Sequence, residues 1–61
     1  MPEPKFELYT DKADKFRFRL VAANGETIAA SEAYASKAGA KNGIASVKKN
    51  ATIAEIVDLT L

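Results

Sequence analysis

The sequence predicts an α+β fold with the element order β-β-β-α-β, in which one helix packs on an antiparallel sheet. Three observations predict it: apolar residues alternate in two short N-terminal segments, Asn24-Gly25 is a turn signal, and apolar residues follow helical spacing after Ser36. The 61 residues allow one small domain, which we place at residues 5–61. Residues 1–4 contain two prolines and are expected to form a disordered tail.

The first two strands are predicted at residues 5–10 and 16–22, where every second residue is large and apolar. The apolar faces of these strands comprise Phe6, Leu8, Phe16, Phe18 and Leu20. Antiparallel pairing that keeps these residues on one face sets Leu8 opposite Phe16 or Phe18. Both registers place Glu7 opposite an arginine on the other face, which is a favourable cross-strand pair.

The third strand is predicted at residues 27–31, and two turn geometries compete before it. A two-residue Asn24-Gly25 loop pairs Val21 with Ile28 and puts Ile28 on the arginine face. A three-residue loop, 23–25, with Gly25 in the left-handed region, pairs Leu20 with Ile28 and Phe18 with Ala30. The second geometry keeps Ile28 in the core, so we favour it.

The helix is predicted at residues 36–50, with Ser36 as its N-cap. One amphipathic stripe is formed by Ala40, Ile44, Val47 and Ala51. Gly39 and Gly43 lie four residues apart inside this helix, where each glycine costs roughly 1 kcal/mol relative to alanine. We expect close approach of the sheet or of a partner helix to offset that cost, and we interpret both glycines as packing positions.

A last strand is predicted at residues 53–61. Because successive residues of a strand lie on opposite faces, one face would carry Ile53, Val57 and Leu59 and the other would carry Ile56. Both faces of the strand therefore carry large apolar residues. A solvated edge strand should be more polar than this. A chain near 60 residues buries only about 60% of the surface of its unfolded form, and this one has no disulfide to compensate. We therefore expect a homodimer, with these four residues as dimer contacts.

The sequence resembles the YegP-like family, small bacterial proteins classed as a domain of unknown function. The resemblance is carried by these residues: Lys5-Phe6-Glu7-Leu8-Tyr9, Phe16-Arg17-Phe18-Arg19-Leu20, Ala22-Ala23-Asn24-Gly25-Glu26, Ile28, Ser31-Glu32, Tyr34, Ser36-Lys37-Ala38 and Asn42-Gly43-Ile44-Ala45-Ser46-Val47-Lys48-Lys49-Asn50-Ala51. Family members occur as single units that dimerise or as tandem repeats. The resemblance implies that two copies build one continuous sheet and exchange their C-terminal strands. It implies no biochemical activity.

Composition excludes several kinds of chemistry. The chain has no Cys and no His, which removes thiol nucleophiles, Cys/His zinc sites and histidine acid–base catalysis. We expect no catalytic residue, no metal and no cofactor. The longest apolar runs are too short to cross a membrane. The absence of cysteine fits a cytoplasmic protein.

Two functions remain open. The first is a structural or protein-interaction module that forms a homodimer and has no catalytic activity. The alternative is weak binding of nucleic acid or another anionic ligand through a basic surface. That candidate surface consists of Tyr9, Arg17, Arg19, Lys41, Lys48 and Lys49. Because the net charge is only +1, we favour the interpretation that these residues form an ordinary solvated surface with Glu–Arg pairs over the interpretation that they bind a ligand.

Overall fold

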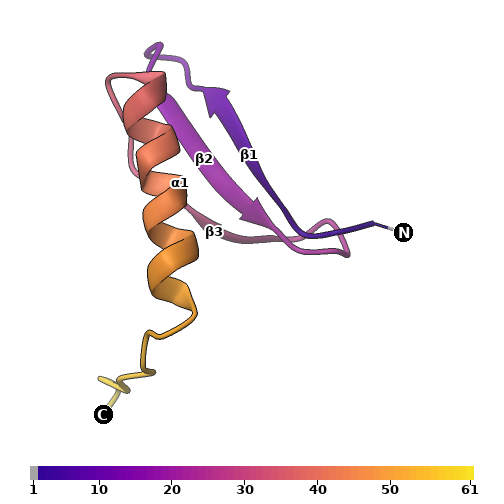
Figure 1. Ribbon diagram of the computed structural model, residues 1–61, viewed down its shortest axis with the longest axis vertical. Coiled ribbons are helices and arrows are strands. Elements are labelled where there is room, and N and C mark those ends of the chain that lie inside the picture. Colours follow the sequence, from indigo (N-terminus) through magenta and orange to yellow (C-terminus); the bar gives the residue numbers. More distant parts are fainter. Residues whose placement is uncertain (1) are drawn as a thin grey trace.

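The computed structural model describes residues 2–61, which form three strands and one helix (Figure 1). The elements are β1 (Lys5–Thr10), β2 (Phe16–Val21), β3 (Thr27–Ala30) and α1 (Lys37–Ala51). The α+β class and the β-β-β-α part of the predicted order are therefore confirmed. Met1, the first residue of the predicted tail, lies outside the described residues, and residues 2–4 are exposed and belong to no strand or helix.

Strand β1 pairs antiparallel with β2 over six residue pairs, in the second of the two predicted registers. Leu8 lies opposite Phe18 and Glu7 opposite Arg19. The alternation of the two strands then separates the apolar side chains from the charged ones. The face that carries Phe18 also receives the helix, because α1 packs on β2 and Tyr34 stacks on Phe18 with a ring-centroid distance of 6.0 Å.

The turn between β2 and β3 has the expected three-residue loop. The backbone N–H of Ala22 donates to the carbonyl of Glu26 at 2.8 Å, and Gly25 has a φ of +89°. The last residue of this loop has a left-handed backbone conformation, which glycine adopts without steric cost.

The predicted register beyond this loop is wrong. Val21 pairs with Thr27, but Leu20 then pairs with Ala29, so a bulge leaves Ile28 as the extra residue of β3. The bulge shifts every later pair by one, and Arg19 rather than Phe18 lies opposite Ala30. Ile28 remains 62% exposed instead of joining the core.

Helix α1 begins after Ser36, whose hydroxyl oxygen accepts a hydrogen bond from the Gly39 N–H at 3.0 Å. Ala40, one turn into the helix, is completely buried. The connection before the helix is held to the sheet by Tyr34, which exchanges two backbone hydrogen bonds with Phe16. The sequence thus positions the start of the helix over the start of β2 (Figure 1).

The predicted strand at residues 53–61 is wrong for the single chain, because these residues form no strand. They continue from the end of α1 and lead away from the sheet (Figure 1). An extended segment becomes a strand only when its backbone hydrogen-bonds to a neighbouring strand, and within one chain none lies beside this segment. Its large apolar residues are all exposed: Val57 is the least exposed, at 69%, and Ile53, Ile56, Leu59 and Leu61 are more exposed still.

The buried core is small for the length of the chain. Only Phe18, Val21 and Ala40 are buried apolar residues among those the structure describes. The accessible surface is 5197 Å², whereas a folded monomer of this mass has roughly 3,800 Å². The radius of gyration is 13.2 Å, compared with about 10.5 Å for a compact chain of this length. The single chain is therefore an incompletely packed unit.

Candidate interaction surfaces

The C-terminal segment, residues 52–61, is the most exposed apolar feature of the molecule. Its large apolar residues are Ile53, Ile56, Val57, Leu59 and Leu61, and none of them packs into the core. Its only acidic residues are Glu55 and Asp58, and it contains no basic residue. The Asp58 carboxylate accepts hydrogen bonds from the hydroxyl of Thr60 and from its backbone N–H, and these two bonds, in that order, lower the pKa of Asp58. The segment thus combines apolar bulk with negative charge.

An apolar groove lies on the helix-bearing face of the sheet, with a volume of about 300 Å³. It opens because α1 packs on the central strand β2 and diverges from the sheet toward its own C-terminal end (Figure 1). The groove is lined mainly by Phe6, Phe18, Leu20, Ala29, Tyr34 and Val47. Several of these side chains are only half-buried, so the groove offers apolar surface to a partner.

The opposite face of the sheet carries an array of paired charges. Arg19 Nε donates to Glu7 Oε1 at 2.6 Å, and Lys5 Nζ lies 3.3 Å from Glu7 Oε2. The Arg19 guanidinium also lies over the Tyr9 ring, with Cζ 4.7 Å from the centroid. The hydrogen bond from Arg19, followed by that from Lys5, lowers the pKa of Glu7 and keeps its carboxylate charged. The predicted Glu–Arg cross-strand contact is thereby present.

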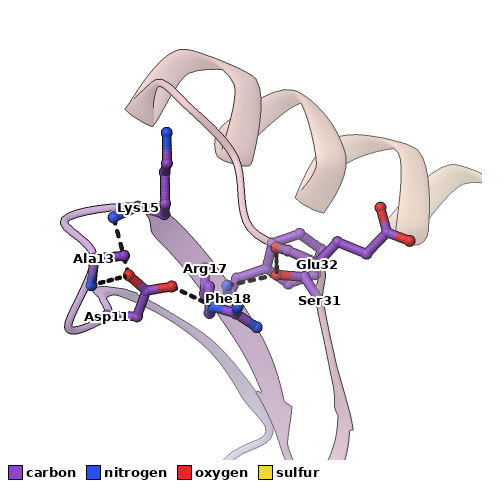
Figure 2. Close-up of polar contacts among 7 residues, drawn as sticks. All are labelled: Asp11, Ala13, Lys15, Arg17, Phe18, Ser31 and Glu32. Carbon is purple, nitrogen blue, oxygen red and sulfur yellow. Dashed lines mark hydrogen bonds and ion pairs between the residues drawn. The ribbon is translucent and has the colours of Figure 1, made fainter.

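Arg17 is paired with Asp11, which lies in the connection between β1 and β2. Its Nε donates to Asp11 Oδ2 at 2.6 Å, while Asp11 Oδ1 accepts from the backbone N–H groups of Ala13 and Lys15 (Figure 2). The hydrogen bond from Arg17 and then that from Lys15 lower the pKa of Asp11. An aspartate that bonds to the N–H two residues later is a recognised turn pattern, and that pattern is the sequence signal for this contact.

The structure does not bring the six candidate ligand-binding residues together. Tyr9, Arg17 and Arg19 lie on the charged face of the sheet, whereas the lysines are on α1, which covers the other face. Lys41, Lys48 and Lys49 are exposed, and Lys48 Nζ lies 5.7 Å from the centroid of the Phe6 ring. Because both arginines are already paired with carboxylates, the charged face has no unpaired guanidinium for an anion.

The remaining predicted residues have structural positions. Asn24 Oδ1 accepts from the Glu26 N–H at 3.0 Å in the β2–β3 turn, and Ser36 caps α1. Gly39 and Gly43 both face Tyr34, where a Cβ would meet its side chain. Among residues 2–61, no group of three or more acidic side chains has the arrangement of a metal site. The same part of the chain has no helix with the length and apolar character needed to span a bilayer.

One polar contact was missed by the sequence analysis although it holds β3 in place. Ser31 Oγ accepts from the Phe18 N–H at 2.9 Å and donates to the Glu32 carbonyl at 2.8 Å (Figure 2). The Ser31 N–H in turn donates to the Phe18 carbonyl. No sequence pattern indicates this contact, because it depends on the register that the bulge creates.

These features define a small α+β protein with a sparse core and an exposed apolar segment at the end of its helix. Residues 11–58 match the family described as "Domain of unknown function (DUF1508)". A UPF0339 protein of Treponema denticola is 62% identical over 55 residues, which cover 90% of this chain and 95% of that protein. The UPF0339 protein YegP of Shigella flexneri is 58% identical over 45 residues, which cover 74% of this chain and 41% of that protein.

A solved structure shares the fold. The solution NMR structure of a protein from Haloferax volcanii matches with a TM-score of 0.85 at 49% identity, over 95% of this chain and 98% of that one. The chain therefore belongs to the DUF1508 family of UPF0339 proteins, which includes YegP, and the resemblance predicted from the sequence is confirmed. The family is of unknown function, and the Haloferax relative shows that it is not confined to bacteria.

Proposed function

We propose that this chain is a self-associating interaction module: a homodimer, without catalytic activity, whose subunits exchange their C-terminal segments. We treat residues 5–61 as its single domain, with Ile53, Ile56, Val57 and Leu59 as dimer contacts. The observation that carries the proposal is the surplus of exposed surface. The chain exposes 5197 Å², about 1,400 Å² more than a folded monomer of its mass.

That surplus has the size and character of an interface. A standard protein–protein contact buries about 800 Å² on each partner, and exchanged segments bury more. Much of the surplus comes from apolar side chains such as Ile56, which is 98% exposed, and Leu59, which is 86% exposed. Burial of apolar surface contributes roughly 25 cal/mol per Å², so covering these side chains favours association.

The alternative function, weak binding of nucleic acid or another anion, has less support. Arg17 and Arg19 would have to leave Asp11 and Glu7 to contact a phosphate, since each guanidinium donates to a carboxylate at 2.6 Å. The candidate lysines lie on a different face from the arginines. Exposed lysines on a helix are typical of a solvated surface.

Light scattering combined with far-UV circular dichroism over a dilution series tests the proposal. We expect twice the chain mass at micromolar concentration and loss of helical signal on dilution, because association and folding are coupled in such a unit. Val57→Asp should shift the dissociation midpoint to higher concentration by on the order of tenfold or more, since it places a charge in an apolar contact. Ala23→Asp adds the same charge in an exposed turn and should leave the midpoint unchanged. A chain that stays folded with the mass of a monomer at all these concentrations contradicts the proposal.

A further inference from the structure

The chain contains two Asn-Gly dipeptides, Asn24-Gly25 and Asn42-Gly43. Asparagine followed by glycine is prone to spontaneous deamidation, because glycine has no Cβ to shield its backbone nitrogen and lets the chain bend toward the asparagine side chain. The reaction is intramolecular, so its rate depends on the local backbone. One dipeptide lies in a turn and the other in a helix, and the fold therefore separates their reactivity.

Asn24-Gly25 lies in the exposed turn between β2 and β3, at the tip of the sheet away from α1 (Figure 1). Apart from the two chain neighbours of Gly25, no atom lies within 4 Å of the position that its Cβ would take. The Gly25 N–H donates to the Ala22 carbonyl at 2.9 Å. Breaking that hydrogen bond frees the nitrogen, and an exposed turn opens locally without unfolding of the domain.

The same turn assists the chemistry at the Asn24 side chain. The Glu26 N–H donates to Asn24 Oδ1 at 3.0 Å. This hydrogen bond draws electron density from Cγ, the atom that is attacked. It also stabilises the negative charge that develops on Oδ1 as the attacking nitrogen bonds to Cγ. The turn thus presents an activated amide next to an uncrowded backbone nitrogen.

Asn42-Gly43 is held in the middle of α1 and is crowded. A helical N–H donates to the carbonyl four residues earlier, which fixes the Gly43 nitrogen against Gly39. A Cβ at position 43 would lie 2.5 Å from Tyr34 Oη and 3.0 Å from Phe18 Cε2. To bend toward the Asn42 side chain, the backbone must break the helix and displace Tyr34. Such an opening has a much higher free energy than the opening of a turn.

We propose that Asn24 is a deamidation site of the folded protein and that the fold protects Asn42. The Gly25 nitrogen loses its proton and bonds to Asn24 Cγ, the Cγ–Nδ2 bond breaks, and the leaving nitrogen takes up a proton and departs as ammonia. Water then opens the resulting succinimide at either carbonyl, which gives aspartate or isoaspartate at position 24. The reaction uses only water, and the inference does not depend on self-association.

The two products differ in their effect on the turn. Aspartate keeps an oxygen that accepts from the Glu26 N–H, so the turn is retained. Isoaspartate routes the main chain through the former side chain and adds one backbone atom to the loop. The hydrogen bond from the Ala22 N–H to the Glu26 carbonyl, 2.8 Å long, closes the loop only at its present length. Because β3 begins directly after Glu26, isoaspartate disturbs its pairing with β2.

Peptide mapping of aged protein tests the proposal, because trypsin places each asparagine in a different peptide: residues 20–37, 42–48 and 50–61. During incubation of the folded chain at neutral pH, we expect deamidated peptide 20–37 to accumulate on the order of tenfold faster than deamidated peptide 42–48, or more. Peptide 50–61 is the internal control. Asn50 Nδ2 donates to the carbonyl and hydroxyl of Ser46, and alanine follows it, so this peptide should stay unchanged.

Incubation in guanidinium chloride separates the effect of the fold from that of the dipeptide. The two Asn-Gly peptides should react at similar rates there, because neither the turn nor the helix remains. Equal rates in the folded protein would overturn the protection of Asn42. Reaction of peptide 20–37 in denaturant alone would overturn the assignment of Asn24 as a site in the folded protein.

Thermal unfolding tests the difference between the two products. Methylation by a protein isoaspartyl methyltransferase, which accepts isoaspartate and not aspartate, identifies the isoaspartate form after chromatographic separation. That form should melt at a lower temperature than the wild type, whereas Asn24→Asp, which carries the other product from the start, should melt close to the wild type. Equal melting temperatures of the isoaspartate form and the wild type would overturn the expected effect on the turn.

Discussion

The ring of Tyr34 occupies the space that a side chain at position 43 would need. A Cβ on Gly43 would lie 2.5 Å from Tyr34 Oη and 3.0 Å from Phe18 Cε2. Tyr34 also stacks on Phe18, so it joins the chain entering the helix to the centre of the sheet. This contact is a physical reason for a glycine in the middle of α1, where alanine would favour the helix.

Gly43→Ala should lower the free energy of unfolding by about 1 kcal/mol. Overpacking against Tyr34 and Phe18 costs roughly 1–3 kcal/mol, which exceeds the gain of about 1 kcal/mol in helix propensity. Urea unfolding at equal chain concentration measures the difference. Asn42→Ala, at the adjacent exposed position of the helix, should instead stabilise by a few tenths of a kcal/mol. A gain in stability for Gly43→Ala would show that the tyrosine ring moves aside without cost.

Gly25→Ala should destabilise by about 1–2 kcal/mol, the cost of an L-residue in the left-handed region. Gly25 has a φ of +89°, and no atom lies within 4 Å of the position that its Cβ would take. The cost therefore comes from the backbone and not from a clash. Gly25→Asn should cost less, because asparagine tolerates this region better. Thermal unfolding of the two variants compares them, and equal losses would indicate a different cause.

Ser31→Ala should destabilise by about 1–3 kcal/mol, because it leaves the N–H of buried Phe18 without an acceptor. Ser31 Oγ is its acceptor, at 2.9 Å. Ser46→Ala is the matched control, since Ser46 is exposed and its hydroxyl accepts only from the Asn50 side chain. Its stability should stay near that of the wild type. Similar free energies of unfolding for both variants would contradict a specific role of the Ser31 hydroxyl.

Acidification should destabilise the fold in part through Asp11. The pKa of Asp11 is lowered in the folded state by Arg17 and by the backbone of Lys15. A carboxyl whose pKa is lowered by folding contributes stability above its unfolded pKa of roughly 3.9, and that contribution is lost as the pH falls through the folded value. Asp11→Asn should therefore be less stable than wild type at neutral pH, with a smaller difference near pH 3. Urea midpoints across this range provide the measurement, and a constant difference would exclude the Asp11 contribution.

The paired arginines predict weak or absent binding of single-stranded RNA. Arg17 and Arg19 are held by Asp11 and Glu7, so the charged face presents little net positive charge. Fluorescence anisotropy of a labelled oligouridine at low salt should show no saturable binding. Glu7→Gln releases Arg19 and should increase any residual affinity, with a steep dependence on salt. Tight binding by the wild-type chain would contradict this prediction and support the alternative function, the binding of nucleic acid.

Much of the local structure could be predicted from the sequence, because it depends on residues close together in the chain. The alternation in residues 5–10 and 16–22 is sufficient to predict two strands, and Ser36 marks the start of the helix. The Glu7–Arg19 contact follows from the pairing of those strands. The Arg17–Asp11 contact was not predicted, because it depends on a loop in which Asp14 adopts a φ of +59°.

What the sequence by itself determined is thus the type and order of the first four elements and the three-residue turn at Gly25. Only the tertiary structure decided the bulge that exposes Ile28, because the bulge is a feature of how β3 pairs with β2, and this pairing is what brings Ser31 to Phe18. It also decided that residues 53–61 are not a strand within one chain. Their apolar residues favour burial, but a strand forms only where a neighbouring backbone supplies hydrogen bonds, and the local sequence does not determine whether such a neighbour is present.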